Sequence, residues 1–303
     1  MMKLTHFYDE IRRILPDLEI RPNELMAKHT SFRIGGPAAL MAFPKSVEEL
    51  AELLIQSELM DIKIAILGAG TNVLAPDAGI DSLVICLKDC MSGMERIDET
   101  HIRVAAGVTM TRAALFAAGL GLSGLEFAHG IPGTVGGGIY MNAGAYGGEI
   151  CQVCTQVDVI DRKGKARTLS GGQMGFSYRH SVLEETGDIV LSGVFSLEPA
   201  PEGQIRGQMQ ELMKKRSASQ PLDLPSAGSA FKRPVGGYAA ALIDQAGLRG
   251  FQIGGAAISQ KHAGFAVNLG GATANDVKRL LTEVSDAVFE KFGIRLEPEV
   301  RIW

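Results

Sequence analysis

The sequence has 303 residues, of which 46% are hydrophobic and 21% are charged, and its net charge is −4. This composition is that of an ordinary globular protein, and the length allows two domains and a substantial core. No global basic charge points to nucleic acid or to an anionic membrane, and no apolar run reaches the ~18–20 residues of a membrane span. The N-terminal residues lack the apolar centre of a signal peptide, so we expect a cytoplasmic protein.

Hydrophobic periodicity predicts three helices and four strands in the first 120 residues. Ser46 is placed to cap the second helix, because its hydroxyl can accept a hydrogen bond from an N–H group of the first turn. The third helix is expected to end at a glycine. The helices are predicted at residues 1–20, 46–59 and 110–120, and the strands at residues 28–38, 62–67, 83–87 and 101–107.

Residues 119–148 contain eleven glycines in thirty positions. Glycine loses more conformational freedom on folding than any other residue, so this composition needs a reason. We expect the backbone to lie directly against a bulky ligand and to present its N–H groups to it. A phosphate-bearing cofactor is the natural candidate, because successive N–H groups form anion-binding concavities. A glycine-rich surface loop is the alternative.

The second half of the chain predicts a hairpin, two further strands and three helices. The hairpin covers residues 157–169, with Lys163-Gly164 at its turn, and the last helix begins with the capping pair Thr273 and Asp276. The other strands are expected at residues 189–199 and 297–303, and the helices at residues 204–217, 237–246 and 274–292. A loop rich in Pro and Ser is expected at residues 219–229.

The alternation of strands and helices predicts an α/β or α+β protein of two domains. A Pro/Gly cluster at residues 199–203 marks the expected boundary. The predicted domains are residues 1–199, with subdomains 1–90 and 91–199, and residues 200–303. A ligand between two domains would follow the usual position of small-molecule sites.

The segment Gly68-Ala69-Gly70-Thr71-Asn72 follows a predicted strand, as a Rossmann phosphate loop does. The third glycine of that fingerprint is missing, and Pro76 would interrupt the helix that should follow. A doubly wound dinucleotide domain is therefore disfavoured. A tight loop that binds a diphosphate through its N–H groups and the Thr71 hydroxyl stays open.

The chain contains four cysteines, at positions 86, 90, 151 and 154. Cys151 and Cys154 form C-x-x-C, a spacing found in redox and zinc sites. Cys86 and Cys90 lie in or after an apolar strand-like run, which favours buried thiols without a chemical role.

Five blocks in order resemble one known family. They are GAGTNVL, GLEFAHGIPGTVGGGIYMNAGAYGGE, FSYRHS, PSAGSAFKRP and LEPEVR. They are similar to the UDP-N-acetylenolpyruvoylglucosamine reductase family, which forms a precursor of peptidoglycan. The resemblance extends over residues 27–303.

The resemblance implies an α+β fold, with a two-part FAD-binding domain of the vanillyl-alcohol-oxidase/PCMH type and a smaller substrate-binding domain. It implies non-covalent FAD and NADPH as co-substrate. The substrate would be UDP-N-acetylglucosamine enolpyruvate, reduced to UDP-N-acetylmuramate, with no nucleic acid or membrane involved and a monomer favoured. The residues expected at FAD are Gly68, Ala69, Gly70, Thr71, Asn72, Val73, Leu74, Gly130, Ile131, Pro132, Gly133, Thr134, Gly136, Gly137, Gly138, Asn142 and Gly144.

Three residues match the family's catalytic positions: Ser229 as proton donor, with Arg179 and Glu299 as its partners. Reduced FAD would pass hydride from N5 to the β-carbon of the enolpyruvyl group. Arg179 would stabilise the developing enolate, and Ser229 would protonate the α-carbon with help from Glu299, Lys232 or water. Tyr178, Arg179, Lys232 and Ser229 would bind substrate.

Each of these residues also has a structural interpretation. Arg179 can be a surface cation beside Tyr178, Ser229 a turn residue, and Glu299 a partner of Arg301 or a lysine. Residues 214–216, Lys-Lys-Arg, can meet UDP phosphates or form a solvated helix face. In relatives of this broader flavin fold a histidine can attach FAD covalently. The reductase family holds FAD non-covalently, so we expect no such bond at His129.

The sequence departs from longer family members, because its second domain is short and the tyrosine-bearing loop that closes over substrate has no counterpart. The shorter type of the family therefore fits better. A flavin oxidase of the same fold and a catalytically silent FAD-binding protein are the competing hypotheses.

Overall fold

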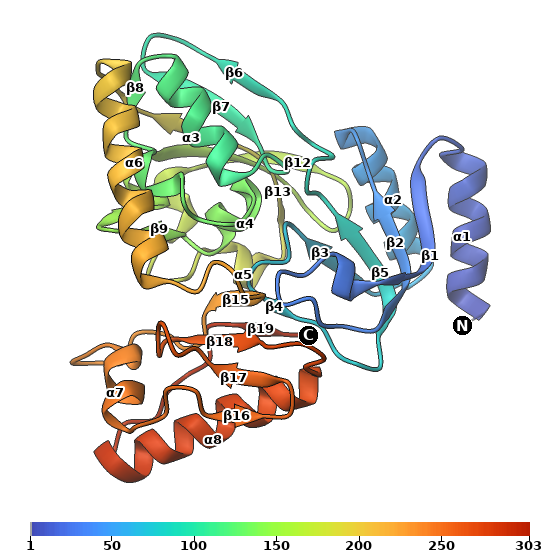
Figure 1. The fold of residues 1–303 in the computed structure, drawn as a ribbon. Coiled ribbons are helices and arrows are strands. Elements are labelled where there is room, and N and C mark those ends of the chain that lie inside the picture. Colours follow the sequence, from blue (N-terminus) through green and yellow to red (C-terminus); the bar gives the residue numbers. More distant parts are fainter. Residues whose placement is uncertain (1) are drawn as a thin grey trace. The chain divides into compact units, whose positions relative to one another are not determined.

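A computed structural model describes residues 2–303 (Figure 1). The contacts divide the chain into two compact units. The first unit consists of Met1–Pro22, Leu40–Ala69 and Ser82–Lys215, and the second of Asn23–Ala39, Gly70–Asp81 and Arg216–Trp303. The boundary that we expect after residue 199 stays a prediction. The second unit thus combines the C-terminal residues Arg216–Trp303 with two internal segments, Asn23–Ala39 and Gly70–Asp81.

A four-stranded sheet has the order β1-β2-β5-β3, and most of its residues belong to the first unit. Its strands are β1 (Glu19–Leu25), β2 (Pro37–Phe43), β5 (Ile80–Cys86) and β3 (Ile64–Leu67), and β3 and β5 are parallel. Helices α1 (Met2–Ile14) and α2 (Val47–Leu59) accompany this sheet in Figure 1. The periodic apolar positions explain why: Phe7 and Ile11 of α1 and Leu50 and Leu54 of α2 are fully buried in one core.

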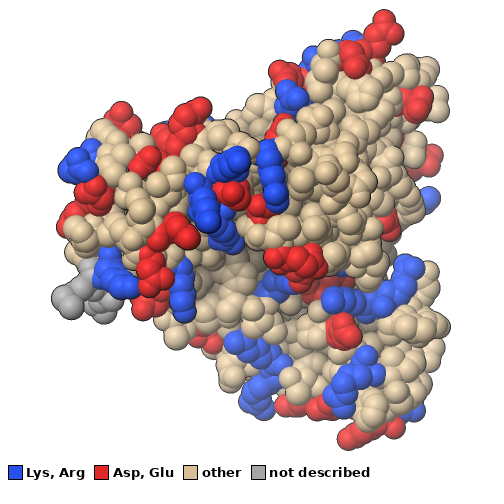
Figure 2. All heavy atoms as spheres, turned by 180° about the vertical axis from the view of Figure 1, so that it is seen from behind, with Lys and Arg blue, Asp and Glu red and all other residues tan. Residues whose placement is uncertain are grey.

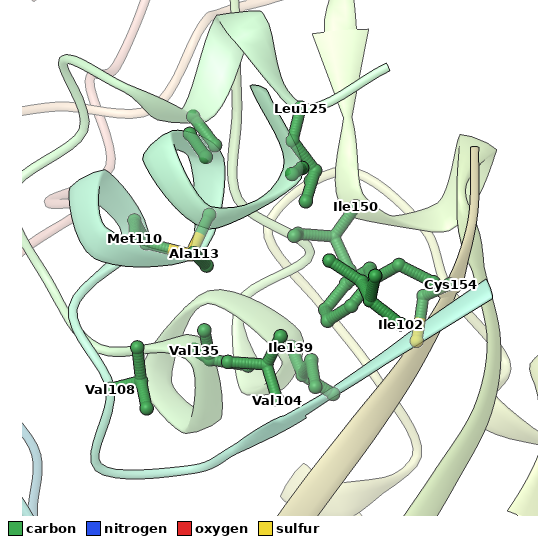
Figure 3. Close-up of a cluster of buried hydrophobic side chains, with 14 of the residues drawn as sticks. Ile102, Val104, Val108, Met110, Ala113, Leu125, Val135, Ile139, Ile150 and Cys154 are labelled. Atoms are coloured by element: carbon green, nitrogen blue, oxygen red, sulfur yellow. The ribbon is translucent and has the colours of Figure 1, made fainter. Parts of the chain in front are cut away.

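A five-stranded antiparallel sheet, in the order β12-β11-β13-β7-β6, forms the rest of the first unit's framework. Alternate residues of its strands enter a second core, as period-two patterning requires, and Ile102 and Val104 of β7 are examples (Figure 3). The strands are β6 (Met94–Arg96), β7 (His101–Ala105), β11 (Cys154–Ile160), β12 (Ala166–Ser170) and β13 (Ile189–Ser196).

Helices and short strands complete this unit. Helix α6 runs from the first unit into the second, because the dividing point falls after Lys215. The helices are α3 (Met110–Gly119), α4 (Val135–Tyr140), α5 (Leu183–Thr186) and α6 (Glu202–Ser219); the 3-10 turns are η2 (Glu126–Ala128), η3 (Ile150–Gln152) and η4 (Gly171–Met174); the short strands are β8 (Leu122–Ser123), β9 (Gly144–Ala145), β10 (Gly148–Glu149) and β14 (Glu198–Pro199).

The second unit contains a four-stranded sheet in the order β15-β18-β17-β16, with α8 packed against β16 and β17. Val277, Leu281, Val284 and Val288 lie on one face of α8 and are buried. The elements are η1 (Met26–Lys28), β4 (Val73–Leu74), β15 (Ser226–Ser229), α7 (Ala239–Gln245), β16 (Gln252–Ile253), β17 (Ala256–Ile258), β18 (Phe265–Asn268), α8 (Ala274–Phe292) and β19 (Arg301–Ile302).

Helix predictions that rest on capping residues are confirmed. The Ser46 hydroxyl accepts a hydrogen bond from the N–H of Glu49, 3.2 Å away. Thr273 and Asp276 form the reciprocal capping box of α8, with both hydrogen bonds at 3.0 Å. Gly293 ends this helix in the left-handed conformation, with φ of 71°.

The predicted strand at residues 28–38 is wrong. Residues 29–36 form turns and irregular chain, and the strand begins only at Pro37. The Thr30 hydroxyl donates to the carbonyl of Ile34 at 2.9 Å, which closes a local turn, and Arg33 and Gly35 have φ values of 56° and 130°. The hydrogen bond of the Thr30 side chain to the nearby backbone therefore favours a turn where we predict a strand.

Two further expectations need correction. The first helix ends at Ile14 instead of residue 20, because Pro16 disfavours helical backbone at the residue before it. The loop expected at residues 219–229 contains β15. The glycine-rich segment also holds a helix, α4, that the sequence pattern did not predict.

Acidic and basic side chains are interspersed on the face drawn in Figure 2, in keeping with the small net charge. Within residues 2–303, no helix combines the length and the apolar character needed to cross a membrane.

Candidate active site

The segment Gly68–Leu74 follows β3 and consists of a tight loop and then β4. Gly70 has φ of 61°, and a Cβ atom there would lie 2.0 Å from the carbonyl oxygen of His29. A Cβ atom at Gly68 would lie 2.6 Å from the hydroxyl of Thr134. Both glycines are therefore required by the protein's own packing, whatever else the loop contacts.

The end of this loop is bound to the last residues of the chain inside the second unit. Strand β4 pairs in parallel with β19, so that Val73 lies opposite Arg301. The carbonyl of Asn72 accepts from the N–H of Arg301 at 2.9 Å. The side-chain amide of Asn72 donates to the carbonyl of Glu299 at 3.1 Å. Asn72, expected at the cofactor, thus also positions the backbone of Glu299.

Ser229 ends β15 and lies opposite Phe265 of β18. The next residue, Ala230, is held from both sides: its N–H donates to Gly264 at 2.8 Å, and its carbonyl accepts from the N–H of Glu299 at 2.9 Å. Main-chain hydrogen bonds therefore bring Ser229 and Glu299 together. The Ser229 side chain is exposed, so it is accessible to a substrate.

Lys232 belongs to the same group of residues. Its N–H donates to the carbonyl of Glu297 at 2.8 Å, and its ammonium group lies 3.4 Å from the Glu297 carboxylate. Four residues of the predicted site, at positions 72, 229, 232 and 299, are thereby gathered in the second unit.

The glycine-rich segment helps to build a core. Val135 and Ile139 of α4 are fully buried beside Met110 (Figure 3). A Cβ atom at Gly136 would lie 2.9 Å from the Ala106 side chain, and one at Gly138 would lie 2.7 Å from the Met110 sulfur. These two glycines let α4 approach the core closely, which is not the role that we expect for them at a cofactor.

Other parts of this segment do face outward. Gly137 is exposed, and a Cβ atom there would have only an ordinary contact with Thr134, at 3.5 Å. Pro132 is exposed, and Gly133 has φ of 149°, a conformation that favours glycine. Residues 130 and 131 are half-buried.

His129 has a buried Nδ1 atom with no hydrogen-bond partner among residues 2–303. Burial lowers the pKa of His129, so the imidazole is neutral near pH 7. A buried polar atom without a partner is costly unless a ligand or water satisfies it. This orphaned nitrogen, together with the exposed Pro132 and Gly137, fits a large polar cofactor at this segment.

The side chain of Asn142 is buried and makes several hydrogen bonds close to Arg179, one of the predicted catalytic residues. Asn142 is 1% exposed and its φ is 42°. The amide nitrogen donates to the carboxylate of Glu149 and to the carbonyl of Ser177, each at 3.1 Å. The amide oxygen accepts from the N–H of Cys151 at 2.9 Å. Asn142 therefore fastens the chain before Tyr178 and Arg179 to the hairpin β9–β10.

Arg179 lies at the tip of a tight turn, since Ser177 and His180 exchange both main-chain hydrogen bonds. Its φ is 57°, which is unusual for a residue other than glycine. The guanidinium donates to the carbonyl of Gly144 at 3.4 Å and lies 5.0 Å from the ring centre of Tyr178. The structure thus brings positions 142, 144, 178 and 179 together in the first unit.

A hollow of about 240 Å³ in the second unit was not predicted from the sequence. Its lining includes the basic residues Arg249 and Lys261, the acid Asp244, and His262, whose pKa is lowered by burial and by Arg249, so that the imidazole is neutral near pH 7. Arg249 is engaged by Asp244, and Lys261 donates to the carbonyl of Ser217 at 2.6 Å. The residues that line this hollow match no sequence motif, and the fold brings them together.

The four cysteines are free thiols. Burial raises the pKa of Cys90 to about 11 and that of Cys154 to about 12, so neither is a thiolate near pH 7. In the described part of the chain, no three His, Cys, Asp or Glu side chains gather as metal ligands.

Comparison with known proteins identifies both parts of the chain. Residues 38–170 match the FAD binding domain family, and residues 220–303 match the family described as UDP-N-acetylenolpyruvoylglucosamine reductase, C-terminal domain. The reductase of Latilactobacillus sakei subsp. sakei is 45% identical over 94% of this chain and 93% of its own length. The reductase of Caldanaerobacter subterraneus is 45% identical over 97% of each chain.

Solved structures agree. The crystal structure of UDP-N-acetylenolpyruvylglucosamine reductase from Thermus caldophilus superposes with a TM-score of 0.80, at 35% identity, and covers 94% of this chain and 98% of that chain. A 4-ethylphenol oxidase from Gulosibacter chungangensis, with a TM-score of 0.52 at 15% identity, covers 98% of this chain and 65% of that chain and shows a shared fold alone. The predicted FAD-binding α+β fold is confirmed. The chain is a flavoenzyme that belongs to the UDP-N-acetylenolpyruvoylglucosamine reductase family.

Proposed function

We propose that this protein reduces the enolpyruvyl group of UDP-N-acetylglucosamine enolpyruvate to a D-lactyl ether, with NADPH as reductant, in the cytoplasm. The product would be UDP-N-acetylmuramate, a precursor of peptidoglycan. The observation that carries this proposal is the grouping of Ser229, Lys232 and Glu299 by main-chain hydrogen bonds in the unit that matches the reductase family.

The residues that would hold FAD non-covalently lie in the loop after β3 and in the glycine-rich segment. Near these segments Pro132 and Gly137 are exposed, and the buried His129 Nδ1 atom has no hydrogen-bond partner among residues 2–303. When bound, FAD supplies the transfer of a hydride from NADPH to the β-carbon of the enolpyruvyl group.

Arg179 would stabilise the negative charge that develops on the substrate carboxylate and α-carbon. Its guanidinium is preorganised, because the left-handed backbone, the Gly144 carbonyl and the Tyr178 ring fix its direction. A fixed charge needs no reorganisation when the substrate charge appears, and this is the main advantage of such a group.

Ser229 would give its hydroxyl proton to the α-carbon as the β-carbon gains hydride, so that the double bond becomes saturated. An isolated serine is a weak acid, so Glu299, whose N–H is bound to the carbonyl of Ala230 next to Ser229, would assist by orienting Ser229 or a water molecule. Lys232, 3.4 Å from Glu297, supplies a positive charge to the same region.

The hollow lined by Arg249, Lys261 and His262 is our candidate for the diphosphate of the UDP group. The positive charges of Arg249 and Lys261 would attract an anion, and their hydrogen bonds to the Asp244 carboxylate and the Ser217 carbonyl hold the two side chains in place. Lys214, Lys215 and Arg216 on α6 are the second candidate set.

Anaerobic stopped-flow absorbance tests the proposal in two steps. NADPH should bleach the flavin band near 450 nm, and UDP-N-acetylglucosamine enolpyruvate should then restore it. Bleaching by a hydroxy acid but not by NADPH would support an oxidase instead. A flavin that neither compound changes would point to a silent binding protein.

A further inference from the structure

Among residues 2–303, seven residues other than glycine have positive φ: Asn23, Arg33, Asp61, Asp89, Asn142, Tyr146 and Arg179. Four of these are Asn or Asp, which tolerate this conformation, whereas a bulky side chain pays a strain of ~1 kcal/mol or more. Two of the three bulky residues, Tyr146 and Arg179, lie in the same part of the first unit. Strained residues of this kind cluster at functional sites.

Tyr146 occupies the tip of the hairpin β9–β10. Ala145 pairs with Gly148, so Tyr146 and Gly147 form a two-residue connection. Their φ values are 54° and 89°, as in a type I′ turn, where Asn or Gly is usual at the first position. Tyrosine at this position therefore gives a less stable fold than asparagine or glycine would.

The hairpin below Tyr146 has little freedom to relax. A Cβ atom at Gly148 would lie 2.5 Å from the Phe127 ring, and one at Gly144 would lie 2.6 Å from the Glu149 side chain. Asn142 adds its buried hydrogen bonds to Glu149 and Cys151. The fold thus holds the turn in place while the Tyr146 side chain stays 46% exposed.

Arg179 is anchored on this same hairpin, because its guanidinium donates to the carbonyl of Gly144 at 3.4 Å. Gly144 and Tyr146 are two residues apart, so their Cα atoms lie at most ~7.6 Å from each other. A tyrosine side chain spans a similar length. The phenol and the guanidinium can therefore reach one small anionic group together.

We propose that Tyr146 is a further substrate-binding residue, whose phenolic hydroxyl donates a hydrogen bond to the carboxylate of the enol ether that Arg179 stabilises. This inference rests on the proposed reductase activity. It explains why a strained tyrosine occupies a turn that asparagine or glycine would form more easily.

Tyr146→Phe keeps the ring and the turn but removes the hydroxyl. In anaerobic stopped-flow experiments, reduction of the flavin by NADPH should proceed within about twofold of the wild-type rate. The dissociation constant of the enolpyruvyl substrate for the reduced enzyme should rise about 10- to 100-fold, because a hydrogen bond to a charged group is lost.

Tyr146→Asn tests the strain separately. Asparagine suits the left-handed turn, so the melting temperature of the holoprotein should rise by about 2–4 °C while substrate affinity falls as in Tyr146→Phe. Arg33→Asn is the matched control, since Arg33 is also bulky, exposed and left-handed, with φ of 56°. It should gain stability with unchanged kinetics.

The outcomes separate the two proposals. If the reduced wild-type flavin is not reoxidised by the enolpyruvyl substrate, the proposed function and this inference both fail. If the wild type responds and Tyr146→Phe binds substrate as tightly, the inference alone is overturned. If Tyr146→Phe slows flavin reduction and flavin reoxidation equally, Tyr146 has a structural role, and the inference is also overturned.

Discussion

The two units hold their functional residues by different means. In the first unit, Arg179 and Tyr146 have left-handed backbones, and the buried side chain of Asn142 fixes the surrounding chain. In the second unit, Ser229 and Glu299 are placed by main-chain hydrogen bonds through Ala230. Substitution of Asn142 should therefore disturb geometry, whereas substitution of Ser229 should remove chemistry and leave the scaffold intact.

Ser229→Ala should have the largest effect and should spare the scaffold, because the hydrogen bonds of Ala230 do not involve the Ser229 side chain. Flavin reduction by NADPH should survive. Reoxidation by the enolpyruvyl substrate should slow by about 10²–10⁴-fold, the usual loss when a positioned proton donor is removed.

Stopped-flow absorbance checks this, with Ser226→Ala on the same strand as control. A Ser229→Ala enzyme with wild-type reoxidation would remove this serine from the mechanism, and an equal loss in Ser226→Ala would point to damage of β15.

Asn142→Ala should damage both stability and activity. It removes three buried hydrogen bonds and places alanine at φ of 42°. We expect the free energy of unfolding to fall by about 2–4 kcal/mol, with a lower kcat because Arg179 loses its fixed direction. Urea denaturation and steady-state kinetics measure the two effects. Asn23→Ala, also at positive φ, is the control for backbone strain, and an equal loss there would contradict the special role of Asn142.

Asn72→Ala should have an intermediate effect. The Asn72 amide loses its hydrogen bond to the Glu299 carbonyl, while the β4–β19 pairing remains. We expect a loss of about 1 kcal/mol in unfolding free energy and a fall in kcat of about tenfold. Asn72→Asp should be worse, since a carboxylate cannot donate to that carbonyl. If both variants keep the wild-type kcat, Asn72 does not position Glu299.

Cysteine substitutions should have the smallest effect. Burial raises the pKa of Cys151 and raises that of Cys154 to about 12, so thiolate forms only as the pH approaches these higher values. Alkylation of Cys154 at pH 8 should be very slow, and Cys151→Ser should keep full activity. Mass spectrometry after iodoacetamide treatment measures the first expectation. Rapid oxidation of the pair to a disulfide, with loss of activity, would contradict the second.

Sequence patterns predicted those elements whose determinants are local. The helices after Ser46 and Thr273 begin as expected, because each cap acts within three residues. The turn around Thr30 was missed, since the same residues alternate as a strand would. The catalytic assignments of Ser229, Arg179 and Glu299 came from the family resemblance, because single polar residues carry no spacing signal of their own.

Glycine shows the limit of such predictions most clearly. The sequence shows that Gly136 and Gly138 need room, but it does not show what fills that room. The structure places Ala106 and Met110 there. The contact between Asn72 and Glu299, 227 residues apart, likewise had no local signal. Contacts between residues far apart in the sequence determine both the surroundings of these glycines and the Asn72–Glu299 hydrogen bond. A pattern of a few neighbouring residues carries no information about such contacts.

The pairing of β4 with β19 has a consequence for synthesis of the protein. Asn72 leaves the ribosome long before Glu299, which follows 227 residues later, and the N–H groups of Arg301 and Trp303 close on the carbonyls of Asn72 and Leu74 last of all. A nascent chain can fold its early helices during translation, but the loop after β3 gains these hydrogen bonds only when Arg301 and Trp303 have emerged from the ribosome. Coenzyme capture at this loop is therefore expected to follow translation of these residues.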